Sequence, residues 1–292
     1  MPTRATSASG DGPFNLFVSD WEPAPARLPA GARAWAIGDV HGHLDHLDAL
    51  LAAVQTRIAA APDGHKSLIM LGDTVDRGPD NIAALIRAAT LDIAGVDCTA
   101  LWGNHEEYLD TFLSDPNADD GFLAFWAANG GLATLANLGV DPAEVSRRSA
   151  ADIFAMGRAL APPAVREALS RLRTSARIGG YLFVHAGVHP RHGLDDVDIQ
   201  RLTTMREPFL TGEHWSHDFA VVHGHSIIGP DVKAHRISVD SGAYYTGVLT
   251  AVELVDDHAR FLCVTRERDL DALMKIRKRR PLSSESWRAL EV

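Results

Sequence analysis

Three short polar blocks in the first part of the chain carry the kinds of side chain that hold divalent metals. Each block directly follows an apolar run, and together they supply aspartates, histidines and an asparagine. The blocks are Gly38-Asp39-Val40-His41-Gly42-His43, Gly72-Asp73-Thr74-Val75-Asp76-Arg77-Gly78 and Gly103-Asn104-His105-Glu106. Carboxylates, imidazoles and amide oxygens that meet in one place can bind metal ions and leave room for a phosphate. The blocks therefore predict two-metal chemistry on phosphate esters.

Six side chains form the predicted ligand set. Asp39 and His41 lie two residues apart, so their side chains can converge on one ion just past the end of a strand. Asp73 could bridge two ions, because a carboxylate has two oxygens. Three oxygen donors and three imidazoles suit manganese, the first expectation, or iron, zinc or cobalt better than calcium or magnesium. The six residues are Asp39, His41, Asp73, Asn104, His185 and His225.

Three further residues of these blocks fit the remaining catalytic roles. Two metals about 3.5–4 Å apart would lower the pKa of a bridging water, polarise a phosphoryl oxygen and hold both reactants in line. Arg77 can grip phosphate oxygens with two parallel hydrogen bonds. His105 could protonate the leaving oxygen, and Asp76 could orient His105 and favour its protonated form.

A repeating strand–helix pattern has to position the three blocks. Apolar runs predict buried strands that end at Gly38, Gly72 and Gly103. Residues 44–58 and 82–89 lie between them and have apolar side chains at helical spacing. This β-α-β-α-β order predicts a parallel sheet, whose ligands bind beyond the carboxyl ends of the strands, where all three blocks fall. The predicted strands are Ala34–Ile37, Leu68–Leu71 and Val96–Trp102.

The second half of the chain continues less regularly. Residues 105–175 are rich in Ala and Leu at amphipathic spacing, which predicts a mostly helical cap or insertion beside the site. Strands predicted at 182–184 and 219–222 end at His185 and at His223-Gly224-His225. Three later runs are β-like and close in sequence, so we expect antiparallel strands there. These runs are 235–240, 247–254 and 260–265.

The elements predict one α/β domain (α+β) between two tails. The domain is expected at residues 32–268. Residues 1–31 are rich in Pro, Ala, Gly and Ser and are expected to form an irregular tail. Residues 269–292 form a charged C-terminal tail, in which Lys275–Arg280 is interpreted as a solvated helix end.

Composition excludes several classes of function. The chain has 292 residues, a 46% hydrophobic content and a formal net charge of -10, so a broad nucleic-acid-binding role is not expected. No apolar run approaches the length of a membrane span, and the N-terminus has no apolar signal core. The two cysteines, Cys98 and Cys263, form no CxxC pattern. A cytoplasmic location is therefore expected, and the sequence indicates no particular oligomeric state.

Together, the motifs resemble the metallophosphoesterase superfamily, and specifically bacterial members of the phosphoprotein phosphatase (PPP) family of serine/threonine protein phosphatases. The resemblance covers about residues 33–255. It implies a calcineurin-like β-sandwich flanked by helices, so the parallel strands would be only part of one of two sheets. It also implies that Asp39, His41 and Asp73 bind one metal. The second metal would be bound by Asp73, Asn104, His185 and His225.

The same resemblance implies roles for residues around the metals. His105 with Asp76 resembles the acid pair of the family. The segment Met205–Phe209 resembles one that supplies a second phosphate-binding arginine, which makes Arg206 the candidate; the alternative is a surface arginine. The predicted phosphate contacts are Arg77, Arg206 and Asn104. Two further segments resemble short bacterial PPP phosphatases without an assigned role, namely Trp126–Gly131 and Asp240–Gly247.

Three functions remain open from the sequence. The first is removal of phosphate from phosphoserine, phosphothreonine or phosphotyrosine in proteins, or from a small phosphoester, by direct attack of a hydroxide that bridges two metals. The second is a nucleoside polyphosphate hydrolase of the diadenosine tetraphosphatase type. Its base would need stacking partners, for which the candidates are Trp126, Trp215, Tyr244 and Tyr245. The third is a non-catalytic scaffold, which the complete ligand set disfavours.

Overall fold

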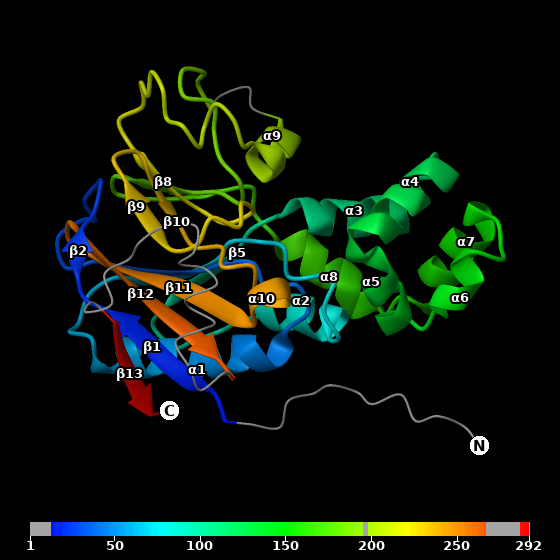
Figure 1. Cartoon of the computed structure of the whole chain (residues 1–292), viewed down its shortest axis with the longest axis horizontal. Helices are drawn as coiled ribbons and strands as arrows, with labels where there is room; N and C mark the ends of the chain where they lie inside the picture. Colours follow the sequence, from blue (N-terminus) through cyan, green and yellow to red (C-terminus); the bar gives the residue numbers. More distant parts are fainter. Residues whose placement is uncertain (1–12, 195–197, 267–286, 292) are drawn as a thin grey trace.

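The protein is a two-sheet sandwich with helices outside the sheets (Figure 1). The structure, a computed structural model, describes residues 13–194, 198–266 and 287–291. One sheet has eight strands and the other has five. This agrees with the calcineurin-like β-sandwich that the sequence motifs imply.

The larger sheet contains the predicted β-α-β-α-β unit. Strands β3 (Arg33–Ile37), β4 (Lys66–Met70) and β5 (Asp97–Ala100) pair in parallel, and helices α1 (Leu44–Ala60) and α2 (Asn81–Ala89) connect them. The remaining strands of this sheet pair antiparallel and extend it beyond β3. They are β11 (Val248–Val255), β12 (His258–Thr265), β1 (Asn15–Ser19), β13 (Trp287–Glu291) and the short β2 (Glu22–Pro23).

The smaller sheet carries the two late histidine motifs. Its central strands β7 (Tyr181–Phe183) and β8 (Ala220–His223) run parallel, and β10 (Arg236–Ser238) pairs in parallel with β8. The two edge strands are antiparallel to their neighbours. They are β6 (Ala176–Ile178) and β9 (Asp231–Lys233).

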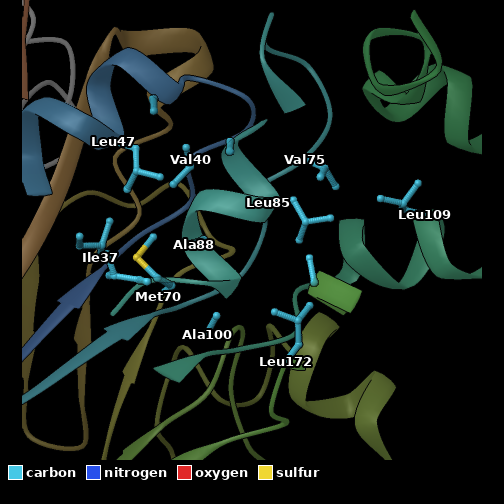
Figure 2. Packing of buried hydrophobic residues seen from close by; sticks show 14 of the residues in the cluster. Ile37, Val40, Leu47, Met70, Val75, Leu85, Ala88, Ala100, Leu109 and Leu172 are labelled. Carbon is cyan, nitrogen blue, oxygen red and sulfur yellow. The ribbon is translucent and has the colours of Figure 1, made fainter. Parts of the chain in front are cut away.

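Alternation along β3 separates two cores. Ala34 and Ala36 face the other sheet and pack in one buried cluster with residues of β7 and β8, such as Phe183. Trp35 and Ile37 point to the opposite face and join the cluster beneath the helices. Figure 2 shows Ile37 beside Met70 of β4 and Leu47 of α1. With both of its faces buried, β3 rigidly supports the loop that follows it.

Residues 104–171 are mostly helical, as expected for the 105–175 region. Their helices project to one side of the sandwich in Figure 1. A π-helical turn, η1 (Ala127–Gly131), interrupts the series between α4 and α5. The helices are α3 (Asn104–Ser114), α4 (Asp120–Trp126), α5 (Leu132–Asn137), α6 (Pro142–Val145), α7 (Ala150–Leu160) and α8 (Pro163–Arg171). Two short helices lie further along the chain, α9 (Ile199–Thr204) and α10 (Ala243–Thr246).

The expectation of an irregular tail over residues 1–31 is wrong for two segments. Asn15–Ser19 forms β1, in which Leu16, Phe17 and Val18 are buried, and Glu22–Pro23 forms β2. β1 pairs with β12, whose residues lie more than two hundred positions later. The Pro-rich segment next to β1 suggested an irregular chain, but pairing with so distant a partner leaves no local sequence signal.

Three expectations concern the C-terminal part of the chain. Two of them need correction, and the third falls on residues outside the described ranges. The runs 235–240, 247–254 and 260–265 do not form one antiparallel group, because β10 joins the other sheet in parallel with β8. The last two runs do pair antiparallel, as β11 and β12. The predicted charged tail contains a strand, β13 (Trp287–Glu291), which pairs with β1. The basic segment 275–280 lies outside the described residues.

None of the helices in the described ranges has the length and apolar character needed to cross a membrane.

Candidate metal centre

The predicted site residues lie just past the carboxyl ends of five strands. Asp39 follows β3, Asp73 follows β4, Asn104 follows β5, and His185 and His225 follow β7 and β8. The loops that carry them are hydrogen-bonded to each other. The backbone N–H groups of Val40 and His41 donate to the Asp73 carbonyl at 3.1 and 2.9 Å, and Gly224 N–H donates to the His185 carbonyl at 2.8 Å. The two sheets therefore contribute to one fixed cluster of polar side chains.

Two groups of potential ligand atoms share the Asp73 carboxylate. His41, Asp73 and His105 form one group, and Asp73, His185 and His225 form the other, with the atoms of each group all within 4.8 Å of one another. All of these side chains are buried except His225, which is partly buried. Asp73 Oδ2 faces the imidazoles of both groups, while Oδ1 accepts the His105 backbone N–H at 3.0 Å. One carboxylate oxygen therefore lies between the two groups, which fits the bridging role expected for Asp73.

Asp39 lies beside these groups rather than within them. Both of its carboxylate oxygens accept the backbone N–H of His225, at 3.1 and 3.0 Å. Burial and the neighbouring carboxylate of Asp240 raise the pKa of Asp39 well above its usual range. A cation in this pocket would offset that repulsion, so Asp39 fits the environment of a bound metal although its oxygens face the backbone.

The histidines are held in orientations that suit metal binding. The Nδ1 atom of His41 donates to the Val75 carbonyl at 2.8 Å, and Nδ1 of His185 donates to the Leu71 carbonyl at 2.7 Å. Because a carbonyl only accepts, Nε2 is the nitrogen that carries the lone pair in the neutral form of each imidazole. The Nε2 atoms face Asp73 Oδ2, at 3.7 Å for His41 and 3.2 Å for His185. Such a back-side bond is the usual arrangement for a metal-ligating histidine.

Unpaired buried atoms provide a second test of fit. Asn104 Oδ1 is buried and has no hydrogen-bond partner among the described residues, and the buried His185 Nε2 has only the Asp73 carboxylate opposite it, at 3.2 Å. The Asn104 amide nitrogen donates to the Tyr108 hydroxyl at 3.2 Å, so its oxygen is the atom left over. A buried acceptor without a donor is costly unless something else binds it. The residues present therefore fit a divalent metal at this position.

The charges of the group strongly perturb its protonation. Burial disfavours the charged form of His185, but the carboxylates of Asp73 and Asp39 outweigh it and raise the pKa of His185 to about 10. Burial would raise the pKa of Asp73, but His185 and His105 lower it well below its usual range. Burial and the cation of His185 lower the pKa of His225 to about 3. These opposite shifts within one small pocket show how strongly its members interact.

Asp76 and Arg77 contact His105, which also belongs to the first group of potential ligand atoms. His105 Nδ1 and Asp76 Oδ2 are 2.6 Å apart, and Arg77 Nη2 lies 3.2 Å from His105 Nε2. Arg77 Nη1 also donates to His41 Nε2. The structure thus places Asp76 against one nitrogen of His105 and Arg77 near the other.

Arg206 also reaches this pocket. Its Nε donates to His225 Nε2 at 3.1 Å, although the arginine itself is exposed. Both candidate phosphate arginines thus contact imidazole nitrogens of the candidate metal ligands. The guanidinium groups of Arg77 and Arg206 lie against the lone pairs of His41 and His225. This arrangement agrees with a site that binds cations and phosphate.

Sequence reasoning assigned no role to Glu106, which fixes the loop after β4. The carboxylate is fully buried and accepts N–H groups of Asp73 (2.8 Å), Thr74 (2.6 Å), Val75 (3.3 Å) and Gly103 (2.9 Å), together with the Thr74 hydroxyl (2.7 Å). The available signal was its place three residues after Gly103, where a glutamate bonds back to the start of a helix.

Gly103 allows this close packing around Glu106. A Cβ at position 103 would lie 2.2 Å from Asp73 Oδ1 and 2.9 Å from Glu106 Oε2. Any larger residue would therefore displace the shared carboxylate or the group that holds its loop.

Two more residues contact the site, of which Asp240 had no predicted role and Tyr244 was considered only as a stacking partner for a base. Asp240 is buried, and burial together with the charge of Asp73 raises its pKa to about 6, although the Gly242 N–H opposes that shift. The Tyr244 ring lies under the Arg77 guanidinium, 4.3 Å from its centroid, and edge-on to His41 at 5.3 Å. Both lie in the Asp240–Gly247 segment, which the resemblance had singled out without a role.

Several site residues have strained backbone conformations. His41, Asp73, Asp76, Arg77 and His225 all have positive φ, between 45° and 71°. Side chains other than glycine rarely adopt this region, and such residues gather at functional sites, where the surrounding structure holds them. The strain lies on the residues for which chemical roles were predicted.

Comparison with known proteins gives a family match and similar folds. A family model described as calcineurin-like phosphoesterase matches residues 32–264. A crystal structure of a candidate diadenosine tetraphosphatase is 23% identical, with a TM-score of 0.51, and the match covers 78% of this chain and 94% of that one. The cold-active protein-tyrosine phosphatase of a psychrophilic Shewanella species is 18% identical, with a TM-score of 0.50, and the match covers 80% of each chain. A comparison with curated protein sequences found no match.

Proposed function

The chain belongs to the calcineurin-like phosphoesterase family, and we propose that it is a two-metal phosphomonoesterase that removes phosphate from phosphoproteins, in the manner of bacterial PPP phosphatases. One observation carries the proposal. The two groups of ligand atoms share Asp73, and His105 of the first group is paired with Asp76.

The proposed ligands divide between two ions. Asp39, His41 and Asp73 would hold one, for which Asp39 must turn at least one oxygen away from the His225 N–H. When bound, two divalent ions supply the Lewis acidity that activates a water and draws charge from the phosphoryl oxygens. Manganese is the proposed metal, with iron, zinc or cobalt as alternatives. The second ion would be held by Asp73, Asn104, His185 and His225.

The side chains around the ligands would bind the phosphate and move one proton. Arg77 and Arg206 would bind phosphoryl oxygens, helped by the Asn104 amide. Water that has released one proton to the solvent attacks phosphorus as the bond from phosphorus to the leaving oxygen breaks. That oxygen takes the proton from His105 Nε2, which then regains one from the solvent. Asp76 accepts from Nδ1, so Nε2 is the nitrogen that faces the reaction. A proton on Nε2 removes the acceptor that Arg77 contacts here, which frees the guanidinium for phosphate.

Substitution of His105 by Asn tests the proton donor. We expect kcat on an alkyl phosphate such as a phosphoserine peptide to fall by about 10²–10⁴-fold, the usual range for general acid catalysis. p-Nitrophenol leaves without protonation, so its phosphate should be affected far less. Equal losses on the two substrates, or full retention of activity on the alkyl phosphate, would contradict the role of His105.

A nucleoside polyphosphate hydrolase is the second candidate, favoured by two exposed aromatic rings in α10, of which Tyr244 lies against Arg77. Tyr244 and Tyr245 are 38% and 77% exposed, so a base could stack on either. Of the other two candidates for stacking, Trp126 is fully buried and Trp215 packs in the cluster around Phe209. Values of kcat/KM for a phosphopeptide and for diadenosine tetraphosphate, measured side by side with manganese, decide between the two functions.

The partners of the protein are proposed from the site, and its location is proposed from its cysteines. Phosphorylated proteins or small phosphoesters would be the partners, and a reducing cytoplasm would suit the free Cys98 and Cys263. A scaffold without catalysis is disfavoured, because His105, Asp76 and both arginines all lie at the ligand groups.

A further inference from the structure

We propose that Trp126 and Thr134, from the helical insertion, are positioning residues that fix Asp76 and through it His105. The inference rests on the proposed acid role of His105. It gives a function to the Trp126–Gly131 segment, which the sequence motifs had left without one. Neither residue would touch the substrate or a metal.

Asp76 is surrounded by donors from the insertion. Trp126 Nε1 donates to Asp76 Oδ2 at 2.9 Å, the same oxygen that contacts His105 Nδ1 at 2.6 Å. Thr134 Oγ1 donates to the other oxygen, Oδ1, at 2.5 Å and accepts the Asp76 backbone N–H at 3.1 Å. All three side chains are fully buried. With both oxygens bonded on opposite sides, the carboxylate cannot rotate without losing a buried hydrogen bond.

The turn between α4 and α5 places both donors on the same carboxylate. Trp126 ends α4, η1 follows, and Thr134 lies in the first turn of α5. Gly130, inside the turn, has φ 103°, and its carbonyl accepts the Arg77 N–H at 3.1 Å. A Cβ at position 130 would lie 2.5 Å from Arg77 Cγ, so the insertion packs directly on the backbone of the arginine.

This contact also explains how two strained residues are kept in place. Asp76 and Arg77 both have φ of 71°. Such a conformation persists only where the surroundings over-determine it. Thr134 Oγ1 accepts the Asp76 N–H, and the Gly130 carbonyl accepts the Arg77 N–H. Among the described residues, these two bonds are the only links from the insertion to these backbone N–H groups. The insertion therefore sets the direction of the imidazole and of the phosphate-binding arginine together.

The first test removes the hydroxyl of Thr134 while keeping the shape of the side chain. Thr134→Val should lower kcat/KM on an alkyl phosphate by about tenfold, a part of the full general-acid effect. The loss on p-nitrophenyl phosphate should stay below about threefold, because its leaving group needs no proton. Thr134→Ser keeps the hydroxyl and should restore most of the difference. Trp126→Phe should resemble Thr134→Val.

A matched control separates positioning from damage to the insertion. Phe154 of α7 is 4% exposed and packs against Phe112 and Phe122, and no described contact links it to Asp76. Phe154→Leu should lower the stability of the insertion and leave the ratio of the two substrates unchanged. If Phe154→Leu changes the ratio as much as Thr134→Val does, the effect is structural and the inference fails.

A spectroscopic measurement keeps the inference distinct from the proposed function. The proton shared by His105 Nδ1 and Asp76 can be followed by nitrogen-15 NMR and assigned with His105→Asn. In the intact protein it should exchange slowly with water, and in Thr134→Val at least about tenfold faster, while Phe154→Leu leaves it unchanged. Unchanged exchange and an unchanged substrate ratio in Thr134→Val would overturn the inference. A protein that hydrolyses neither substrate would sink the proposed function, and the NMR result would still decide the positioning role.

Discussion

The strand-end loops and the helical insertion contribute to the same site in different ways. The loops, at residues 38–43, 72–78, 185–187 and 223–225, supply most of the metal ligands together with Asp76 and Arg77. The insertion, α4 to α8, supplies none of the predicted ligands. Its contribution is the pair of donors to Asp76 and the carbonyl on Arg77. Chemistry and the control of its geometry therefore come from separate parts of the chain.

This difference indicates how variation in each region should affect the protein. Changes in the loops should remove metal or activity on every substrate, because the ligands themselves are lost. Changes in the insertion should alter how well a particular leaving group is protonated. Substitutions in each region test this difference between the loops and the insertion, and those in the loops should have the largest effects.

The largest expected effect is on the shared carboxylate. Asp73→Asn removes the charge that both ligand groups use. We expect kcat to fall by more than about 100-fold on all substrates, beyond the loss usual for residues that only support a ligand. Elemental analysis should also find less metal per chain. Asp48→Asn, at a surface ion pair with Arg87, is the control and should change neither quantity.

The support of the β4 loop should come next. Glu106→Gln places an amide NH₂ group against backbone N–H donors, which leaves at least one buried donor unpaired. We expect a loss of about 2–4 kcal/mol in the free energy of unfolding and a metal dissociation constant that is about 10–100-fold larger. Urea unfolding and metal titration measure these quantities. Glu144→Gln, in a surface pair with Arg148, should change stability by less than about 0.5 kcal/mol.

The protonation of His185 predicts a pH dependence of metal binding. With a pKa of about 10 in the metal-free protein, His185 carries a proton at neutral pH and must lose it to bind a metal. Metal affinity should therefore rise as the pH rises toward about 10. Titration calorimetry in two buffers of different ionisation enthalpy should detect proton release at pH 7, and His185→Asn should release fewer protons. The absence of proton release at pH 7 would contradict a protonated His185 that gives up its proton to a metal.

The same shift affects the stability of the metal-free protein. The folded-state pKa of His185 is raised above its ordinary value of 6.5, so its ion pair with Asp73 stabilises the fold fully below pH 6.5. That stabilisation is lost as the pH rises through about 10. His185→Asn should remove this dependence from unfolding curves measured between these pH values.

The smallest predicted effect concerns the aromatic neighbour of Arg77. Tyr244→Leu removes a cation–π contact worth about 0.5–1 kcal/mol at a partly exposed position, which corresponds to a two- to fivefold rise in KM. We expect this change on phosphopeptides with kcat nearly constant. A much larger effect on diadenosine tetraphosphate would favour base stacking and the second candidate function.

The sequence predicted the parts of the site that local patterns encode. The blocks around Asp39, Asp73 and Asn104 follow apolar runs, and β3, β4 and β5 do form the expected parallel unit. Local pattern also placed His185 and His225 at strand ends. In each case the signal consists of a few neighbouring residues, so no knowledge of distant contacts was needed.

The remaining features depend on contacts between distant residues. Trp126 and Thr134 meet Asp76 across 50 and 58 positions, and no periodicity marks such a pair. Trp126 was instead considered as a stacking surface, a role that its full burial rules out. The strand β1 forms by pairing with β12, more than two hundred positions away, so its own sequence pattern does not identify it as a strand. The hydrogen bonding of the Asp39 carboxylate likewise depends on the backbone of His225, which follows a strand of the other sheet.

The most direct test of the central proposal is a titration of metal-free protein with manganese while phosphate release from a phosphopeptide is followed. Because Asp73 is shared by two ligand groups, we predict that two ions bind per chain and that full turnover requires the second. Activity that saturates with one ion, or phosphate release that proceeds without any bound metal, would contradict a two-metal phosphoesterase.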